Sequence, residues 1–274
     1  GTSGTTTYND GVYGTGTWYS DLQACVTGIR TTSVSTGEGK RIVLLEYSGA
    51  GSKFHDAGPT SGAKWNNWSA DSNNEVHIEL IGSVPHQGSW DGTSMGAANN
   101  GWSPLTSAYG GREMTLVIKD LVIDQSGTGG TNALFNVAGG SGNSKHHRCT
   151  VKGCLIDVSS SPLFANYLDG VGPSSSNPNQ VTFRFESCVA SDRGGEGNML
   201  CRSGYQGGTR VRHTNVELVG CTMDGISIDL NNNPSNAGVG GVFNITAIAT
   251  IIRGADPTPG VYNAGNWLVA YQGT

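Results

Sequence analysis

A short motif recurs along this chain at a nearly constant spacing, and this repeat limits the fold more than any other feature. The motif is an apolar residue, two further residues, a Cys or aliphatic residue, and then mostly apolar residues that often end in Asp. Five copies begin at Ile118, Val151, Phe185, Leu218 and Ile248. Their fourth positions, at steps of 33, 34, 33 and 30 residues, are Leu121, Cys154, Cys188, Cys221 and Ile251. A weaker copy, Ile78 to Gly82, precedes them.

A motif with this period predicts a solenoid, in which each repeat buries its apolar face only by stacking on its neighbours. Val, Ile, Thr and Phe alternate with polar residues in the copies, which is typical of strands, and the third position often suits a tight bend. The signatures of leucine-rich, ankyrin and tetratricopeptide repeats are absent from the sequence. A β-sandwich is the alternative fold, but it requires turns without one motif returning at the same phase.

Composition excludes several other classes of protein. The chain of 274 residues contains 43 Gly and only 14% charged residues, which disfavours long helices and coiled coils. A net charge of −5 argues against electrostatic binding of nucleic acid or an anionic membrane. No stretch approaches the roughly 18 consecutive apolar residues of a membrane span.

Two copies of the motif, Val151–Asp157 and Leu218–Asp224, resemble the repeating unit of right-handed parallel β-helix proteins. These form the pectin-lyase-like superfamily, which includes polysaccharide lyases, rhamnogalacturonan and polygalacturonan hydrolases and phage tailspikes. The segments Gly14–Val26 and Gly39–Glu46 look like the capping helix and first strand that open such proteins. The resemblance implies an all-β fold, a single-stranded right-handed parallel β-helix solenoid with a short N-terminal capping helix. It does not determine function, because one fold hosts many activities.

The same resemblance suggests a division of the chain into three parts. Residues 1–40 would form an N-terminal arm and cap, residues 41–255 the parallel β-helix, and residues 256–274 a C-terminal segment. A Trp-rich loop region is expected at about 52–112, within the range assigned to the parallel β-helix. Loops that project from a solenoid are where a binding surface would be built.

Three of the six cysteines share one phase of the repeat. Because neighbouring strands lie about 4.8 Å apart, Cys154, Cys188 and Cys221 are predicted to form a ladder in the core. No CxxC pair is present, so we expect neither a metal site nor a cofactor.

Two other motifs have nominal chemistry but an unfavourable context. His146, His147, Cys149 and Cys154 carry zinc-ligand atoms, but Cys154 is assigned to the core ladder. We therefore interpret residues 145–148 as a basic surface loop. The segment Gly92–Gly96 matches the nucleophile-elbow pattern, but a poor helix start follows it, so Ser94 is not expected to be a nucleophile.

Carboxylates would carry the reaction if this chain were an enzyme, because glycoside hydrolases use one as acid and a second as base or nucleophile. The best cluster is Asp192, Glu196, Asp224 and Asp229. Asp192 and Asp224 follow the same strand in successive repeats, so they could approach one another. Asp124 and Asp157 continue this column, however, and a column of Asp at a bend is more often turn chemistry.

Four of the six tryptophans, Trp65, Trp68, Trp90 and Trp102, gather in a Gly/Asn/Ser-rich region with few aliphatic residues. They could pack a large loop against the helix, contact another subunit, or stack on sugars. Among the binding roles we favour the subunit interface.

We therefore expect a non-enzymatic structural protein of a virion or surface assembly, such as a phage capsid decoration, tail or fibre component. Its partners would be other subunits of that assembly, including further copies of itself, with a glycan as an additional ligand. It would be located in a virion or outside the cell. The alternative is an extracellular polysaccharide lyase or glycoside hydrolase that acts on a lateral groove, and a carbohydrate-binding module is the third interpretation.

Overall fold

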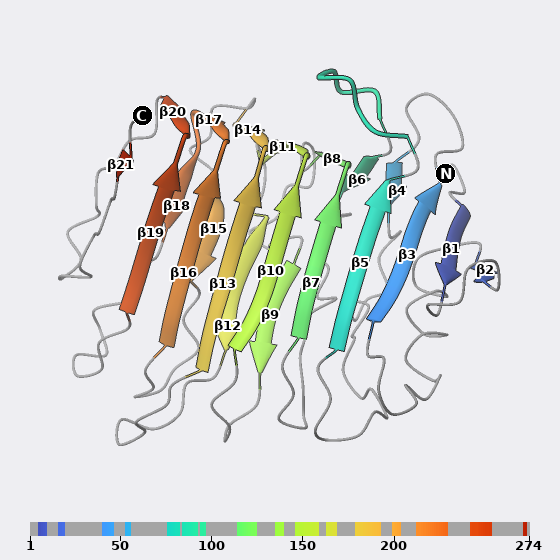
Figure 1. Ribbon diagram of the computed structural model, residues 1–274, viewed down its shortest axis with the longest axis horizontal. Coiled ribbons are helices and arrows are strands. Elements are labelled where there is room, and N and C mark those ends of the chain that lie inside the picture. The colour runs from blue at the N-terminus through green and yellow to red at the C-terminus, as the bar shows by residue number, and fades with distance from the viewer. Residues whose placement is uncertain are drawn as a thin grey trace.

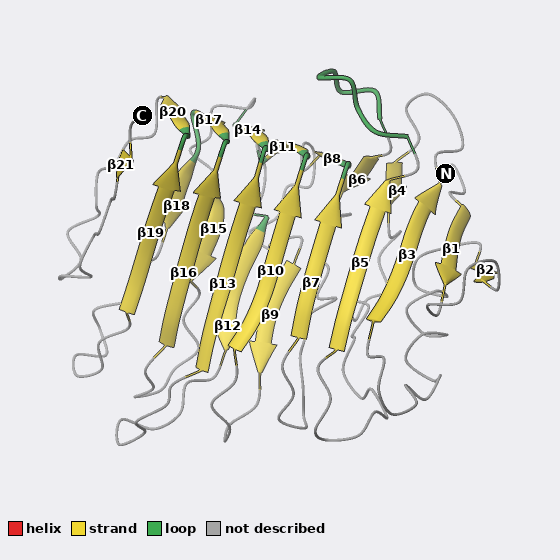
Figure 2. Cartoon of the chain, in the orientation of Figure 1, coloured by secondary structure: helices red, strands yellow, loops and turns green. Residues whose placement is uncertain are grey.

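The structure, a computed structural model, describes the chain in sixteen segments. These are residues 5–9, 16–19, 40–46, 53–55, 76–82, 84–92, 94–96, 114–124, 135–139, 146–158, 163–168, 179–192, 199–203, 212–229, 242–253 and 271–272. Within them every regular element is a strand, and no helix occurs (Figure 2).

The strands form three sheets, which we name A, B and C. Sheet A runs in the order β2 (Gly16–Tyr19), β1 (Thr5–Asn9), β3 (Lys40–Glu46), β5 (Val76–Gly82), β7 (Met114–Lys119), β10 (His146–Lys152), β13 (Asn179–Glu186), β16 (Arg212–Val219), β19 (Val242–Ile248) and β21 (Tyr271–Gln272). Sheet B contains β20 (Ile251–Arg253), β17 (Thr222–Asp224), β14 (Val189–Ser191), β11 (Leu155–Asp157), β8 (Val122–Asp124), β6 (Ser94–Gly96) and β4 (Lys53–His55). Sheet C contains β18 (Ser227–Asp229), β15 (Met199–Ser203), β12 (Phe164–Leu168) and β9 (Phe135–Gly139).

From β7 to β20 the chain passes repeatedly through sheets A, B and C in that order, and we call each passage a cycle (Figure 1). Each strand pairs with its equivalent in the next cycle, and these pairs are parallel. Antiparallel pairing in the described part involves only β1, which pairs with β2 and β3. The expectation of an all-β chain with stacked parallel sheets is thus confirmed for these residues.

The strand register corrects the phase of two motif copies. In sheet B, Thr222 pairs with Ile251, so the residue equivalent to Cys221 is Thr250 and the last step is 29 residues rather than 30. In sheet A, Leu80 pairs with Ile118, so the weak early copy begins at Leu80 and not at Ile78. Ile78 and Leu80 share one face of the strand, and Ile251 and Ile252 are both apolar, so only backbone pairing distinguishes the phases.

A two-residue bend, the A–B corner, joins sheet A to sheet B in each cycle. Its first residue has a positive φ every time: 55° at Asp120, 59° at Gly153, 51° at Ser187, 62° at Gly220 and 47° at Ala249. The amide of this residue donates to a carbonyl of the next cycle, as from Gly153 to Glu186 at 2.9 Å and from Ser187 to Val219 at 2.9 Å. The third motif position is therefore a left-handed bend.

Glycine at a corner that lacks it is expected to stabilise the fold. Ser187 and Ala249 adopt a left-handed conformation that costs an L-residue about 1–2 kcal/mol, part of which is offset by the greater entropy of glycine in the unfolded chain. Ser187→Gly and Ala249→Gly should each raise the free energy of unfolding by roughly 0.5–1 kcal/mol. Gly220→Ala is the matched reverse change. In urea unfolding, the two glycine variants should have higher midpoints than the natural chain, and Gly220→Ala should have a lower one. Destabilisation by both glycine substitutions would contradict this account.

The core lies between the sheets, where residues on the inner faces stack in columns. In sheet A, Ile118, Val151, Phe185 and Leu218 face one another across four cycles and are fully buried. Phe164 at the start of β12 stacks on Phe183 with ring centroids 4.7 Å apart. Its ring also meets Phe185 edge-on at 5.9 Å. These aromatic contacts join sheet C to sheet A.

Several expectations about the chain ends lie outside the described residues. Of the segment Gly14–Val26, expected to hold the capping helix, Gly16–Tyr19 is the strand β2 and the rest lies outside. The strand expected at Gly39–Glu46 corresponds to β3, but it is not the first strand, because β1 and β2 precede it. The division into residues 1–40, 41–255 and 256–274 stays a prediction.

Candidate functional site

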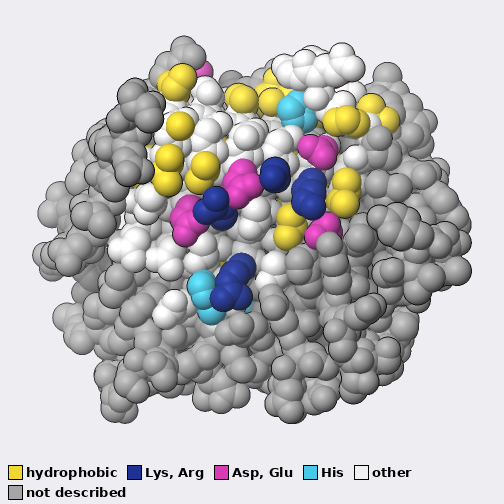
Figure 3. Space-filling model, in the orientation of Figure 1, with side chains coloured by type: hydrophobic (Ala, Val, Ile, Leu, Met, Phe, Trp, Pro, Cys, Tyr) yellow, Lys and Arg dark blue, Asp and Glu magenta, His cyan; other side chains and the backbone are white. Residues whose placement is uncertain are grey.

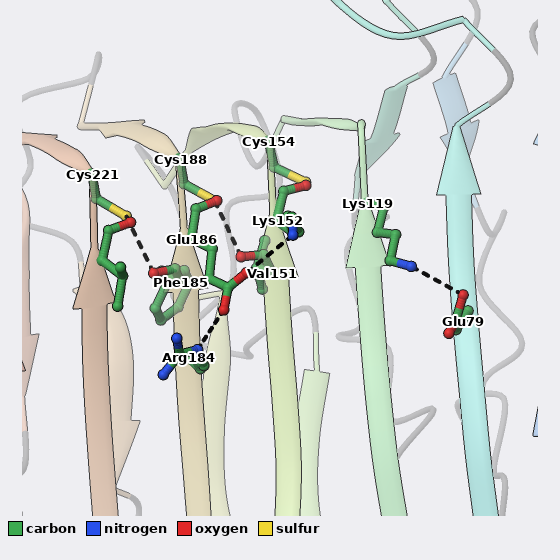
Figure 4. Close-up of polar contacts among 11 residues, drawn as sticks. Glu79, Lys119, Val151, Lys152, Cys154, Arg184, Phe185, Glu186, Cys188 and Cys221 are labelled. Atoms are coloured by element: carbon green, nitrogen blue, oxygen red, sulfur yellow. Dashed lines mark hydrogen bonds and ion pairs between the residues drawn. The ribbon is translucent and has the colours of Figure 1, made fainter.

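The outer face of sheet A carries charged side chains that pair across strands (Figure 3). Arg184 bonds two carboxylates, Glu186 at 2.5 Å and Glu217 at 2.6 Å. Lys152 lies 3.4 Å from the Glu186 carboxylate. Figure 4 draws this ion pair. A separate pair, Lys119 with Glu79, is 3.2 Å apart. Opposite charges on neighbouring strands stabilise a sheet, so these side chains are engaged with one another.

The charge network shifts the pKa of its two central groups. The hydrogen bond from Arg184 lowers the pKa of Glu186, and Lys152 adds to the effect. Hydrogen bonds to Glu186 and then Glu217 raise the pKa of Arg184. Both partners are thereby held in their charged forms.

Acid should weaken the fold through this network. Glu186 has a lowered pKa in the folded chain, so its contribution is present above the unfolded carboxyl pKa of roughly 4.3 and is lost as pH falls through the folded value. Arg184→Gln should reduce the loss of stability between about pH 4.5 and 3 by less than ~1 kcal/mol, because the pair is partly solvated. Asn244→Ala is a control on the same face that changes no charge and leaves Glu186 paired. Identical acid sensitivity of Arg184→Gln and the natural chain would exclude this role.

A row of polar side chains crosses the same face beside the charges. Asn244 donates to the Oδ1 of Asn215 at 2.8 Å, and Asn215 donates to the Oγ1 of Thr182 at 3.4 Å. A ring nitrogen of His146, Nε2, lies 2.8 Å from the same hydroxyl oxygen, and Arg148 Nη2 lies 3.2 Å from His146 Nδ1. Because an arginine can only donate, Nδ1 accepts and the proton of the neutral ring sits on Nε2.

The structure overturns the interpretation of residues 146–148 as a surface loop. His146, His147 and Arg148 belong to β10, and His147 is buried while its two neighbours face outward. Strand alternation places His147 on the inner face with Cys149 and Val151. Lys145 lies outside the described residues.

The three cysteines of the predicted ladder, Cys154, Cys188 and Cys221, are buried thiols at equivalent corner positions (Figure 4). Each Sγ lies within hydrogen-bond distance of the carbonyl two residues earlier, at 3.4, 3.3 and 3.4 Å. It also lies near a carbonyl of the preceding cycle, at 3.9, 3.3 and 3.4 Å, and one of these two oxygens accepts the thiol proton. Thr250 continues the column, because its hydroxyl donates to Ile248 at 2.9 Å in the same way.

The surroundings of three buried thiols, Cys149, Cys188 and Cys221, keep them protonated. A hydrogen bond with Cys154 and burial raise the pKa of Cys188 to about 12. The pKa of Cys221 is also raised, first by its hydrogen bond with Cys188 and then by burial, and burial alone raises that of Cys149. Thiolate is the reactive and metal-binding form, so this column is suited to packing rather than to chemistry.

Ser94, the residue at the nucleophile position of the Gly92–Gly96 motif, lies within the described residues. Ser94 is buried at the start of β6, paired with Val122 of β8, and is therefore part of a strand that continues in parallel pairing. Among the described residues, no three His, Cys, Asp or Glu side chains are grouped so that they could hold a metal ion.

Only part of the predicted carboxylate cluster lies within the described residues. The amide of Asp192 donates to the carbonyl of Asp224 at 3.2 Å, so the two residues lie on adjacent cycles. Asp224 pairs with Ser191, which places Asp192 one residue beyond the column that holds Asp124 and Asp157. Glu196 and the side chain of Asp229 lie outside the described part.

Of the four clustered tryptophans, only Trp90 is described, and Trp65, Trp68 and Trp102 lie outside. Trp90 is exposed in a loop of residues 84–92 that projects between β5 and β6 (Figure 1). The two ends of the loop approach closely, because a Cβ on Gly92 would lie 2.8 Å from the backbone nitrogen of His86.

His86 anchors this loop, and sequence reasoning missed it. Its Nε2 lies 2.7 Å from the carbonyl oxygen of Gly153 at the A–B corner, and its Nδ1 accepts from the Gly88 amide at 3.2 Å. The Ser89 hydroxyl donates to the Asp91 carboxylate within the loop. A single histidine outside any repeat carries no pattern that could have revealed this contact.

No helix in the described ranges has the length and apolar character needed to cross a membrane. Comparison of the chain with protein-family models, with curated proteins and with solved structures gives no match.

Proposed function

We propose that the cycles form a single-stranded right-handed parallel β-helix of the pectin-lyase-like kind, and that the chain is a non-enzymatic structural protein of a virion or surface assembly. A phage capsid decoration, tail or fibre component is the role that fits best. The right-handed sense follows from the general rule for parallel crossover connections. The chain would act with other subunits of the assembly, including copies of itself, in a virion or outside the cell.

The observation that carries the proposal is the continuity of sheet A. Strands β3 to β19 hydrogen-bond in an unbroken parallel series, and the charges on their outer face are paired with one another. The buried corner column of thiols adds a second continuous row along the same direction. A ladder of this kind resists bending and local opening, since each strand is held from both sides. Rigidity is what a spacer or scaffold in an assembly requires.

The test is whether the chain is a fixed part of a large particle. Native material from the source should be fractionated on a sucrose gradient, and the amount of chain per particle should be measured by quantitative mass spectrometry. We expect a constant, symmetric stoichiometry that survives a wash in 1 M salt (roughly a 3 Å Debye length). A chain that remains in the free fractions would count against the assembly role.

A polysaccharide lyase or glycoside hydrolase is the second candidate, and the contact between Asp192 and Asp224 favours it. Carboxylates on adjacent cycles can reach the separation of about 5–9.5 Å that glycoside hydrolysis uses. Acidic and neutral glycans should be tested for reducing ends and unsaturated products. Asp192→Asn and Asp224→Asn should abolish turnover, whereas Glu217→Gln on sheet A should not. Absence of turnover in the natural chain would remove this candidate.

A further inference from the structure

The loop of residues 84–92 shows how a polypeptide segment can bind to the A–B corner. Because the Gly88 amide donates to His86 Nδ1, the proton of the ring sits on Nε2, which donates to the Gly153 carbonyl at 2.7 Å. The acceptor is the main-chain oxygen of a residue with φ of 59°. The corner itself therefore supplies an outward-facing hydrogen-bond acceptor.

The next two cycles repeat this acceptor. Ser187 and Gly220 have φ of 51° and 62°, are exposed, and make the same amide bond to the following cycle as Gly153 does. Their carbonyls therefore point as the Gly153 carbonyl does. Within the described part of the chain, neither oxygen accepts a hydrogen bond. The corner thus offers two more copies of the site that His86 occupies.

Apolar side chains next to these acceptors change from buried to exposed along the corner. Val122, Leu155, Val189 and Ile251 occupy one column of sheet B, at the first position of each strand, with Thr222 between the last two. The first two are 2% and 4% exposed, whereas Val189 is 42% and Ile251 56% exposed. The loop is anchored two residues from Leu155, and the exposed members begin one cycle further on. The exposed stretch continues the surface against which the loop is seated.

We propose that the corner from Ser187 to Ile251 is a docking surface for a loop of a different assembly protein, one that presents a side-chain N–H donor beside a bulky apolar residue. The donor would bind the Ser187 or Gly220 carbonyl, and the apolar residue would cover Val189 or Ile251. The occupant is defined by the chain's own loop, which makes the equivalent contact through His86 one cycle earlier and carries the exposed residues Val84 and Trp90. This inference rests on the proposed assembly role, and it names the surface and the chemistry of the partner.

A cyclic peptide with the sequence of residues 84–92, labelled with fluorescein, is the probe for this surface. Fluorescence anisotropy with the full chain should give saturable binding. Val189→Asp and Ile251→Asp should each weaken it at least tenfold, because a carboxylate would replace the apolar contact. A peptide that carries His86→Ala should also bind at least tenfold more weakly. Asn215→Asp is the matched control, since it adds the same charge to the outer face of sheet A away from the corner, and it should leave binding unchanged.

Three results would overturn the proposal. They are the absence of saturable binding, equal weakening by Asn215→Asp, and self-association in sedimentation that Val189→Asp abolishes, since a second copy would then cover the corner. Urea unfolding of each variant verifies that it is folded, and a second substitution, Val189→Thr, replaces Val189→Asp if the latter unfolds. The particle stoichiometry of the natural chain is measured separately, so failure of peptide binding leaves the assembly role intact if the chain still occurs at a fixed ratio.

Discussion

Phe183→Ala is expected to lower the free energy of unfolding by about 3–5 kcal/mol, the range for deleting a buried aromatic ring. Phe183 is fully buried in β13 and stacks on Phe164, whose ring also contacts Phe185. The substitution would leave a cavity where sheet A meets sheet C. Urea unfolding followed by circular dichroism and by intrinsic fluorescence should give a much lower midpoint by both probes.

The matched control for this core substitution is Val189→Ala. Val189 lies on the exposed side of sheet B, so its truncation should change the free energy of unfolding by less than ~0.5 kcal/mol. If the two substitutions cost the same, the aromatic contacts between the sheets would not support the core. Phe183→Leu, which refills most of the space, should lie between them.

The buried thiols should be almost inert in the folded chain. In a Cys25→Ser/Cys201→Ser background, the four remaining cysteines should react with a disulfide reagent at pH 8 at least about 10³-fold more slowly than in denaturant, because the thiolate is the nucleophile. For Cys188 the cause is a pKa raised to about 12 by its hydrogen bond with Cys154 and by burial. Rates should be measured by absorbance in native buffer and in urea.

Ionisation of these thiols also gives a pH dependence with a defined sign. A raised folded pKa means that stability is present below the unfolded thiol pKa of roughly 8.5 and falls as pH rises above it. Cys188→Ala should flatten part of this alkaline loss, with Ser191→Ala as a control outside the thiol column. Fast labelling of all four thiols in native buffer would show that the corner opens readily.

The repeating part of the fold could be predicted from sequence because its signal is repeated. Cys154, Cys188 and Cys221 occur at the same phase, and this placed the bend correctly in the central cycles. The predicted phase of the last copy was wrong because a threonine replaces the cysteine there. The Thr250 hydroxyl takes the place of the thiol as donor, but its neighbour Ile251 looks like the better match to an apolar motif. Only the backbone register separates two positions that differ by one residue.

Side-chain orientation was harder to predict than the strands. Residues 146–148 have the composition of a basic loop, but alternation from Cys149 and Val151 carries His147 into the interior. Asp192 resembles its neighbours in the Asp column, yet Ser191 holds that place in the register. Local composition suggests exposure for His147 and membership of the Asp column for Asp192, whereas the pairing of whole strands decides the face and the column that a residue occupies.

Outside the columns of the repeated motif, contacts between segments far apart in sequence could not be predicted. His86 and Gly153 are 67 residues apart, and they meet because the loop that follows β5 reaches the corner after β10, which lies two strands along sheet A. The charge network around Arg184 likewise depends on alignment of β13 with β16. Pairing of this kind follows from stacking, which a single motif copy does not encode.

The constant two-residue length of the A–B corner determines where this chain can accommodate extra sequence. Two residues always separate the end of a sheet A strand from the start of the following sheet B strand, between 119 and 122, 152 and 155, 186 and 189, 219 and 222, and 248 and 251. Whole cycles, in contrast, vary from 29 to 34 residues. One residue added at a corner would shift the strand that follows by one position and turn its inward side chains to solvent. All the variation in cycle length lies elsewhere, chiefly in the connections to and from sheet C. A tag, epitope or additional binding loop should therefore be grafted into those connections, which leaves the corners free to hold every cycle in register.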